Sequence, residues 1–559
     1  MMSYNHENAL IVQSDRTILL EVHSPKAEAA REAIAPFAEL IKSPEHIHTY
    51  RLTPLSIWNA RAAGLDVEAM SEALHQHAKY PVPASVSQEI ESLGRRYGLT
   101  RIERSEDGFS LRLIVADEPL AELLRREEPI APLLDQRLSP VSFQVNPGFR
   151  GLLKKALVEV GYPAEDLAGY VAGDALPINL RSVAQSGHPF ILRHYQKEAA
   201  HTFYQSGRVQ GGSGVICLPC GAGKTIVGMA AMAQVRENTL ILTTSLTSVR
   251  QWRRELLDKT DLPEDALAEY SGEKKSTGPV TLATYQILTY RPHKEADFPH
   301  FSLFQARSWG LIIYDEVHLL PAPIFRITAE LQARRRLGLT ATLIREDGRE
   351  GDVFALIGPK RYDVPWRELE AQGFIAAATC REIRVSQDAA RQMEYALAPR
   401  RGQFRVAAEN PRKIEVVQQL IRQEAGHKIL IIGEYIDQLK LLAKVTNFPL
   451  ITGQTSQKFR EELYQQFRDG QLGGLVLSRV GNFALDLPDA DVLIQVSGKY
   501  GSRQEEAQRL GRILRPKSDG RTARFYTLVS LRTCEEDFAR HRQLFLTEQG
   551  YGYQIEILD

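Results

Sequence analysis

Four residues near the middle of the 559-residue chain have the types and spacing of a phosphate-binding loop: Gly221, Gly223, Lys224 and Thr225. They stand between a strand-like apolar run and a helical run, which is the context such a loop requires. Glycines let the backbone curl so that its N–H groups surround phosphate oxygens, while the lysine neutralises the β- and γ-phosphates and the threonine hydroxyl holds Mg²⁺. Leu218 occupies the first position of the full GxxxxGK[ST] pattern, so the match is to a looser form. The segment predicts a site for ATP and Mg²⁺ rather than a plain glycine turn.

Two carboxylates, Asp315 and Glu316, follow the apolar run 311–314 at the end of a predicted strand. Parallel sheets bind ligands at the carboxyl ends of their strands, so these side chains are predicted to lie where the nucleotide binds. We expect Asp315 to hold the Mg²⁺ shell and Glu316 to polarise the attacking water. An acidic pair at a strand end is more often solvated surface or a helix cap, and it is the phosphate-binding loop that favours the catalytic interpretation.

Arg512 and Arg515 belong to the basic run 508–515, Gln-Arg-Leu-Gly-Arg-Ile-Leu-Arg. Phosphoryl transfer spreads negative charge over the equatorial oxygens, so positive charge brought to the γ-phosphate lowers the barrier. Three residues apart on a predicted helix, the two arginines share one face, and arginine fingers contribute on the order of 10³- to 10⁵-fold in rate. The alternative is a solvated helix end near Pro516. Because the run lies far along the chain from the phosphate-binding loop, contact with one nucleotide requires two lobes folded around it, which is typical of a nucleic-acid motor.

The composition is that of an ordinary large globular protein and excludes a single small domain. Hydrophobic residues make up 43% and charged residues 25%, and at about 150 residues per domain the length predicts roughly three to four domains. The 69 acidic residues balance the 69 basic ones, so net charge reveals no partner. A large ATPase can confine its positive charge to one groove, so neutrality does not exclude nucleic acid.

The four cysteines and the lack of long apolar segments indicate a reducing, intracellular compartment. So few cysteines argue against a disulfide framework, and Cys217 and Cys220, although spaced as CxxC, have no second pair to complete four ligands. We therefore expect neither zinc nor an iron–sulfur cluster. The chain has no run of about 18 apolar residues and no leader-type apolar region, so we expect no membrane partner and a cytoplasmic location.

The order of predicted strands and helices favours an α/β fold, with two small α/β domains followed by two parallel-sheet lobes. Pro81, Pro83 and Ser85 mark a linker after the first domain, and a charged, glutamine-containing stretch separates the lobes. The expected segments, in chain order, are 1–80, 85–180, 181–365, 366–410 and 411–559.

Further segments accompany the three described so far. Leu192-Arg193-His194-Tyr195-Gln196 precedes the phosphate-binding loop, and the hydroxyl-rich runs 244–252 and 283–286 follow it. Thr340-Ala341-Thr342 is followed closely by Arg345-Glu346-Asp347. Together these segments resemble the superfamily 2 helicases, and among them the XPB-type (xeroderma pigmentosum group B) DNA repair helicases.

The resemblance implies roles for these segments. It implies an adenine-reading segment, two segments that contact nucleic-acid phosphates without reading sequence, and a Thr-Ala-Thr link between hydrolysis and DNA movement. The residues that it implies are Arg193, Gln196, Asp486 and Gln508 at the ATP site, and Ser245, Thr247, Gln251, Thr284, Tyr285, Arg345, Glu346 and Asp347 at the DNA.

Nearly the whole chain takes part in the resemblance. It implies an XPB-like N-terminal domain at 1–80, a damage-recognition-like domain at 85–180, a thumb-like insert at 366–410 and RecA-like lobes at 181–365 and 411–559. Asn482 and Ala484 stand where an aspartate and a hydroxyl residue are expected in the family. The long charged extensions of eukaryotic members are lacking, which implies a compact prokaryotic member.

The implied activity is that of an ATP-dependent DNA helicase or translocase of DNA repair, moving 3′ to 5′, with ATP and Mg²⁺ as cofactors. Its expected partners are single-stranded, duplex or forked DNA and a nuclease or other repair protein, in the nucleoid of a prokaryote or the nucleus of a eukaryote. Phosphate-contacting motifs leave an RNA helicase and a duplex translocase that never separates strands as alternatives. An ATP-responsive repair scaffold that hydrolyses ATP slowly or not at all is an alternative of another class. Five intact residues argue against it: Lys224, Asp315, Glu316, Arg512 and Arg515.

Overall fold

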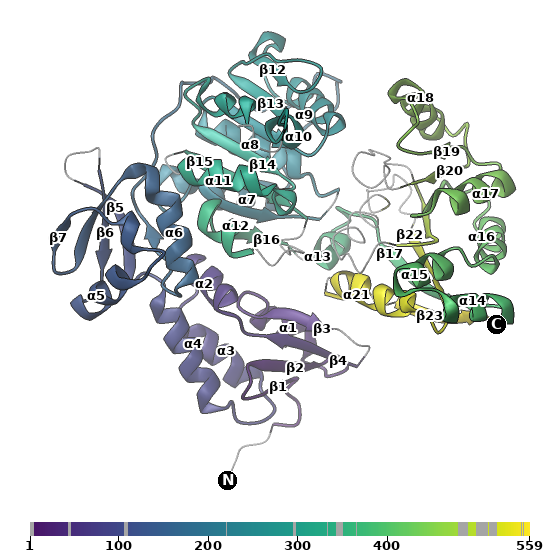
Figure 1. The fold of residues 1–559 in the computed structure, drawn as a ribbon, viewed down its shortest axis with the longest axis horizontal. Helices are drawn as coiled ribbons and strands as arrows, with labels where there is room; N and C mark the ends of the chain where they lie inside the picture. Colours follow the sequence, from purple (N-terminus) through teal and green to yellow (C-terminus); the bar gives the residue numbers. More distant parts are fainter. Residues whose placement is uncertain are drawn as a thin grey trace. The chain divides into compact units, whose positions relative to one another are not determined.

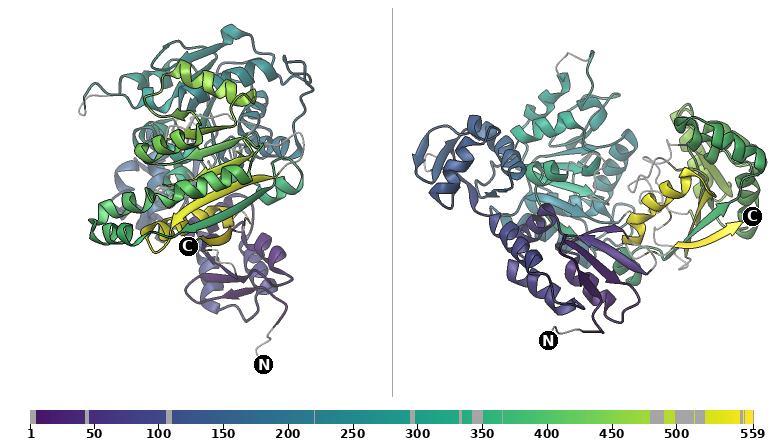
Figure 2. Two further views of the ribbon diagram at one scale, coloured as in Figure 1. Left: turned by 90° about the vertical axis from the view of Figure 1, so that its right-hand side faces the viewer. Right: turned by 60° about the horizontal axis from the view of Figure 1, so that its bottom comes forward.

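The computed structural model divides the chain into two compact units (Figure 1, Figure 2). Unit 1 comprises Met1–Cys217 and Thr225–Asp363, and unit 2 comprises Leu218–Lys224 and Val364–Asp559. The structure describes residues 5–42, 46–105, 110–219, 221–293, 298–331, 334–341, 350–364, 366–478, 490–498, 513, 522–548, 551 and 553–558. Within these ranges, three sheets belong to unit 1 and one sheet belongs to unit 2.

The first sheet of unit 1 is antiparallel, in the order β1-β2-β4-β3, and packs with four helices around one apolar core. Helix α4 joins this core through Val86, Ile90 and Leu93, whereas the sequence predicts that a new domain begins at residue 85. An amphipathic helix must bury its apolar face, and the chain after Pro83 returns α4 onto α2 and α3. The elements are β1 Leu10–Val12, β2 Thr17–Glu21, α1 Ala27–Ile34, β3 Glu39–Lys42, β4 Ile47–Arg51, α2 Pro54–Ala62, α3 Val67–His77 and α4 Ala84–Arg96.

The second sheet, in the order β7-β8-β6-β5-β9, is antiparallel except for the pairing of β5 with β9. Alternation of buried and partly buried residues along β6 gives this sheet one core face, on which α5 and α6 pack. The elements are β5 Thr100–Arg104, β6 Leu111–Val115, α5 Glu118–Arg126, β7 Arg137–Ser139, β8 Ser142–Val145, α6 Arg150–Glu159 and β9 Glu165–Asp166.

Lobe 1, the third sheet with its helices, is parallel throughout, in the order β12-β13-β11-β14-β15-β10-β16. Strands β11 and β13 are buried along their whole length, as expected for apolar strands covered on both faces. The strands are β10 Ser213–Cys217, β11 Thr239–Thr243, β12 Leu267–Tyr270, β13 Val280–Thr284, β14 Leu311–Asp315, β15 Arg335–Thr340 and β16 Lys360–Asp363. The helices are α7 His194–Tyr204, α8 Lys224–Val235, α9 Leu246–Lys259, α10 Tyr285–Leu288, α11 Ala322–Glu330 and α12 Glu350–Leu356.

Lobe 2, in unit 2, is a second parallel sheet, in the order β19-β20-β18-β21-β22-β17-β23. The strands are β17 Ala378–Val385, β18 Ile429–Ile432, β19 Leu450–Ile451, β20 Gly474–Leu477, β21 Val492–Gln495, β22 Ala523–Ser530 and β23 Tyr553–Leu558. The helices are α13 Trp366–Ala371, α14 Ala389–Leu397, α15 Arg400–Ala408, α16 Arg412–Gln423, α17 Ile436–Thr446, α18 Gln457–Arg468 and α21 Cys534–Glu548.

The segment predicted as a thumb-like insert contains the helical pair α14 and α15, which is anchored to lobe 2. The Tyr395 hydroxyl accepts a hydrogen bond of 2.9 Å from the Cys534 N–H, and the Ser530 hydroxyl donates to the Ala407 carbonyl at 2.6 Å. The rings of Phe404 and Phe538 lie edge to face with centroids 5.3 Å apart. The pair therefore packs on the same lobe as α21.

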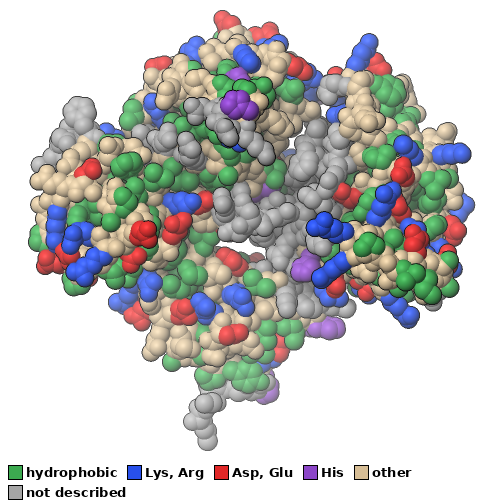
Figure 3. Space-filling view, in the orientation of Figure 1, with side chains coloured by type: hydrophobic (Ala, Val, Ile, Leu, Met, Phe, Trp, Pro, Cys, Tyr) green, Lys and Arg blue, Asp and Glu red, His purple; other side chains and the backbone are tan. Residues whose placement is uncertain are grey.

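Two parallel sheets preceded by two smaller sheets confirm the predicted α/β class with two RecA-like lobes. Basic and acidic side chains are interspersed on the face shown in Figure 3. In the part of the chain that the structure describes, no helix has both the length and the apolar character needed to cross a membrane.

Candidate active site

The predicted phosphate-binding loop connects β10 to α8. Gly221 and Gly223 both have φ of +85°, a left-handed conformation that glycine adopts without the penalty of a side chain. Between them, the Ala222 N–H donates a hydrogen bond of 3.2 Å to the Pro219 carbonyl. Helix α8 begins at Lys224, and a helix N-terminus directs backbone N–H groups and the positive end of the helix dipole toward an anion. This backbone fits the phosphates of a nucleoside triphosphate.

The acidic pair lies at the carboxyl end of β14, as predicted. Asp315 is the last residue of the strand and is partly exposed, as is Glu316. Glu316 has φ of 52° and ψ of 55°, a left-handed conformation that costs a residue with a side chain roughly 1–2 kcal/mol. Such strain concentrates at functional sites, so the backbone favours a catalytic role for Glu316 over a solvated surface turn.

Two aromatic side chains donate hydrogen bonds to Asp315. The indole Nε1–H of Trp252 donates to Asp315 Oδ2 over 3.0 Å, and the Tyr285 hydroxyl donates to the Asp315 carbonyl oxygen over 2.9 Å. Trp252 and Tyr285 are both buried, and burial raises the pKa of Tyr285 well above its ordinary value. Tyr285 therefore remains a donor, and Asp315 is held from two directions.

His318 connects the acidic pair to the Thr-Ala-Thr segment. Its Nδ1 hydrogen-bonds with the Thr340 hydroxyl at 2.6 Å and lies 3.4 Å from Glu316 Oε2. The His318 side chain is buried, so this contact is shielded from water. Neither Trp252 nor His318 is among the predicted site residues, although Trp252 directly follows Gln251 and His318 completes the tetrapeptide Asp-Glu-Val-His.

The two residues predicted to bind adenine lie together at the start of α7. The Arg193 backbone N–H donates to Gln196 Oε1 at 3.0 Å, and the Arg193 guanidinium donates to the Tyr195 hydroxyl at 3.1 Å. Gln196 is buried, so its amide fixes the helix start. Adenine recognition by Arg193 and Gln196 stays a prediction.

The predicted nucleic-acid contacts begin at the carboxyl ends of β11 and β13, which are neighbours in the sheet. The Ser245 hydroxyl caps α9 by accepting from the Ser248 N–H at 3.2 Å, and Thr247 and Gln251 on that helix are partly exposed. The Thr284 hydroxyl accepts from the Ile287 N–H at 3.3 Å and is buried. The N-terminus of α9 suits a phosphate, because the positive end of a helix dipole attracts an anion.

Tyr285 has a different position from the one that its predicted role requires. Only 4% of the residue is exposed and its hydroxyl is bonded to Asp315, so in this structure it does not face a strand of nucleic acid. In the sheet β11 lies between β13 and β14, and the long Tyr285 side chain spans this intervening strand to reach the Asp315 carbonyl. We therefore assign Tyr285 to the support of Asp315.

The remaining predicted site residues lie outside the described residues, and their roles stay predictions. They are Arg345, Glu346, Asp347, Asp486, Gln508, Arg512 and Arg515.

Magnesium fits the donors that the chain offers. Mg²⁺ keeps several waters and is usually bound by one or two carboxylates together with substrate phosphates. Asp315 and the Thr225 hydroxyl supply such donors, and within the described ranges no group of three or more His, Cys, Asp or Glu residues forms a separate metal site. The donor set thus agrees with a metal that arrives with the nucleotide.

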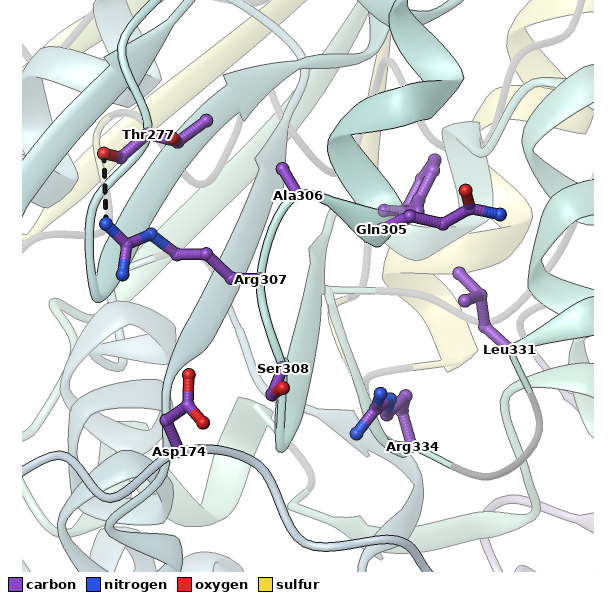
Figure 4. Close-up of a pocket in the computed structure, with 9 residues that line it drawn as sticks. Asp174, Thr277, Gln305, Ala306, Arg307, Ser308, Leu331 and Arg334 are labelled. Carbon is purple, nitrogen blue, oxygen red and sulfur yellow. Dashed lines mark hydrogen bonds between the residues drawn. The ribbon is translucent and has the colours of Figure 1, made fainter.

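A cavity of about 640 Å³ in lobe 1 lies away from these residues (Figure 4). Several of its lining residues directly precede β13, β14 and β15, so it is at the amino edge of the sheet, opposite Asp315. Figure 4 shows the Arg307 guanidinium turned toward Thr277 and away from Arg334, so the two cations do not converge. The cavity is lined by Asp174, Thr277, Phe304, Gln305, Ala306, Arg307, Ser308, Leu331 and Arg334.

Comparison with known proteins gives matches along almost the entire chain. The family model described as "ERCC3/RAD25/XPB C-terminal helicase" matches residues 369–557. "Helicase conserved C-terminal domain" matches residues 10–139, and "Type III restriction enzyme, res subunit" matches residues 189–345.

Three curated relatives align over nearly all of the chain. A protein of Kineococcus radiotolerans named "DNA 3'-5' helicase XPB" is 54% identical over 98% of this chain and 96% of its own length. One of the same name from Mycobacterium tuberculosis is 51% identical over 99% and 98%. The Saccharomyces cerevisiae protein named "General transcription and DNA repair factor IIH helicase/translocase subunit XPB/SSL2" is 32% identical over 98% of this chain and 71% of its own length.

Proposed function

The chain belongs to the XPB family of DNA helicases, and we propose that it couples ATP hydrolysis to 3′–5′ movement on DNA and to DNA opening in repair. It is an ATP-dependent enzyme and a compact member, matching its two bacterial relatives over 96% and 98% of their lengths. The main support for the proposal is the set of hydrogen bonds to Asp315. Its carboxylate lies at a strand end, where it suits Mg²⁺, and each of the two predicted phosphate-contacting segments donates one hydrogen bond to this residue.

We propose that each of the predicted site residues has its own role in hydrolysis. Backbone N–H groups around Gly221 and Gly223 bind phosphate oxygens, and the Lys224 ammonium neutralises their charge. Glu316 orients the attacking water and accepts its proton, while Thr225 and Asp315 hold the metal. When bound there, Mg²⁺ would supply positive charge against the negative charge that develops on the phosphate oxygens.

DNA in single-stranded, duplex or forked form is the proposed substrate, and a nuclease or other repair protein is the proposed partner. The relative in Saccharomyces cerevisiae carries the name of a subunit of a transcription and repair factor, which supports a partner for this chain as well. We place the protein in the cytoplasm, in association with the nucleoid.

Movement along duplex DNA without strand separation is the second candidate function. The printed name of the same relative, helicase/translocase, favours it. Residues that contact phosphates follow a backbone equally well whether or not the strands part.

The test is ATP hydrolysis measured with no nucleic acid and with single-stranded DNA, duplex, forked DNA and RNA, next to strand displacement on the fork. Stimulation by DNA with displacement supports the helicase, and stimulation without displacement supports the translocase. Stimulation by RNA alone contradicts DNA repair, and no turnover under any condition supports a scaffold. Lys224→Ala is the control, since loss of its charge should abolish turnover in every arm.

A further inference from the structure

We propose that Trp252 and Tyr285 are positioning residues that transmit binding of nucleic acid to Asp315. The inference rests on the proposed function, because it assumes that α9 and the end of β13 belong to the nucleic-acid surface. In this proposal, Trp252 and Tyr285 couple the nucleic-acid surface to the carboxylate of Asp315, which is predicted to bind the metal.

The first observation is a repeated arrangement in sequence and space. Gln251 and Thr284, both predicted to contact nucleic acid, are each followed directly by an aromatic residue that hydrogen-bonds to Asp315. Trp252 reaches the carboxylate and Tyr285 reaches the backbone carbonyl of the same residue. A displacement of either segment therefore acts on Asp315 through one side chain.

The second observation is that Trp252 cannot move independently of its surroundings. The residue is 1% exposed, and a Cβ built on Gly228 would lie 2.4 Å from its Cη2 atom. Gly228 is in α8, the helix that begins at Lys224. The indole ring thus lies between the phosphate-loop helix and Asp315, and closely packed groups transmit displacement because the interior is dense.

The third observation concerns the bonds themselves. A hydrogen bond to a charged group contributes more than one between neutral groups. Ligands of a metal depend on such outer partners for their orientation, and loss of one partner typically costs about 10- to 100-fold in metal affinity or activity. The Trp252 bond to the Asp315 carboxylate belongs to this class, so it has enough energy to change turnover.

The test removes the donors and keeps the rings, with Trp252→Phe and Tyr285→Phe in the full chain. Trp309→Phe is the matched control, because Trp309 is also buried in lobe 1 and its indole N–H also donates over 3.0 Å, but to the Leu303 carbonyl. Three quantities are measured in parent and variants: kcat with and without forked DNA, the Mg²⁺ concentration for half-maximal rate, and the Kd for forked DNA with and without a non-hydrolysable ATP analogue and Mg²⁺.

Allosteric coupling is reciprocal, so the nucleotide should change the DNA Kd of the parent, typically by about 5- to 150-fold. We call the ratio of the two DNA Kd values, with and without nucleotide, the coupling factor. In Trp252→Phe and Tyr285→Phe we expect the nucleotide to change the DNA Kd by less than about twofold. The Mg²⁺ requirement should rise on the order of tenfold, with the DNA Kd measured without nucleotide unchanged. Trp309→Phe should match the parent in all three measurements.

Two results overturn the inference. The first is a parental coupling factor in both variants, even with a raised Mg²⁺ requirement, because the aromatic pair would then hold Asp315 without transmitting DNA binding. The second is equal loss of coupling in Trp309→Phe, because the effect would then come from general loosening of lobe 1. A parent whose hydrolysis does not respond to DNA contradicts the proposed function itself, which separates that failure from the other two.

Discussion

Gly228 sets how closely α8 can approach the Trp252 ring. In an exposed helix interior, replacing glycine by alanine stabilises by up to about 1 kcal/mol through helix propensity. At Gly228 the added methyl group would lie 2.4 Å from the indole, and overpacking of this kind costs about 1–3 kcal/mol. The clash outweighs the propensity, so we predict that Gly228→Ala lowers the free energy of unfolding by about 1–2 kcal/mol, measured by denaturant unfolding.

Gly402 provides the matched control. It is also a helical glycine, in α15, but a Cβ there would meet its nearest atom at 3.5 Å, an ordinary contact. Gly402→Ala should therefore stabilise lobe 2 by up to about 1 kcal/mol. If both substitutions stabilise the protein, the packing of Trp252 on α8 is looser than the structure indicates.

At the residue scale, the sequence predicts site residues that are marked by their neighbours along the chain. It misses residues whose contacts depend on the order of the strands in the sheet. Glycines that precede a helix and carboxylates that follow a strand can be recognised from the sequence. Lys224 lies at the start of a helix and Asp315 at the end of a strand, as predicted. Trp252 and His318 are different, because their partners are 63 and 22 residues away in sequence. Only the placement of β11 and β15 on either side of β14 brings those partners together.

At the element scale, the N-terminal sheet carries a titratable group in its interior. His48 on β4 is buried, and burial, together with the charge of Arg31, lowers its pKa from 6.5 to about 4. The unfolded chain takes up this proton near pH 6.5 and the folded sheet only near pH 4, so the unfolded state binds more protons between those values. The stability of this sheet should therefore fall as pH decreases from about 6.5 to about 4.

We predict that the sheet loses up to about 2 kcal/mol by pH 5 and that His48→Phe removes this loss. The measurement is amide hydrogen exchange of β2 and β4 at pH 7 and pH 5, corrected for the intrinsic exchange rate. Equal loss of protection in parent and variant would assign the acid sensitivity to other groups.

The elements themselves are predicted well where a strand is mostly apolar, as in β11, β13 and β14. The extent of the first domain is less well predicted. Pro81 and Pro83 correctly indicate the end of a helix, but they do not show whether the helix that follows packs on the first domain or on the second. That depends on Val86, Ile90 and Leu93, whose partners are contributed by the first sheet and its helices.

At the scale of the whole molecule, both small domains are attached to lobe 1 within unit 1. Asn59 accepts from the Lys360 N–H at 3.1 Å, and Lys155 pairs with Asp352 at 3.1 Å. Asp166 is surrounded by cations: burial by itself raises its pKa, but the charges of Arg150 and Lys154 outweigh burial and hold it well below the ordinary value. Breaking a buried pair of this kind costs about 3–5 kcal/mol, so these ion pairs stabilise the second domain, to which all three residues belong.

The two-lobe hypothesis requires lobe 2 to supply charge to a nucleotide bound at Lys224, and the predicted carriers are Arg512 and Arg515. An arginine finger acts in the transition state, where negative charge spreads over the γ-phosphate oxygens, and contributes little to the ground state. We predict that Arg515→Ala lowers DNA-stimulated kcat on the order of 10³-fold or more, with the Kd for nucleotide changed by less than about threefold. Single-turnover hydrolysis and equilibrium binding of a fluorescent ATP analogue give the two quantities.

Arg540→Ala is the control for this prediction, because Arg540 is an exposed arginine of α21 in the same lobe, and its ion pair with Asp537 at 3.4 Å is solvated. Exposed pairs contribute at most about 1 kcal/mol, so this variant should retain the parental rate. Weakened nucleotide binding in Arg515→Ala, in parallel with kcat, would mean that the arginine binds the ground state. A parental rate in Arg515→Ala would leave Arg512 to supply the charge, and a parental rate in Arg512→Ala as well would refute the two-lobe hypothesis.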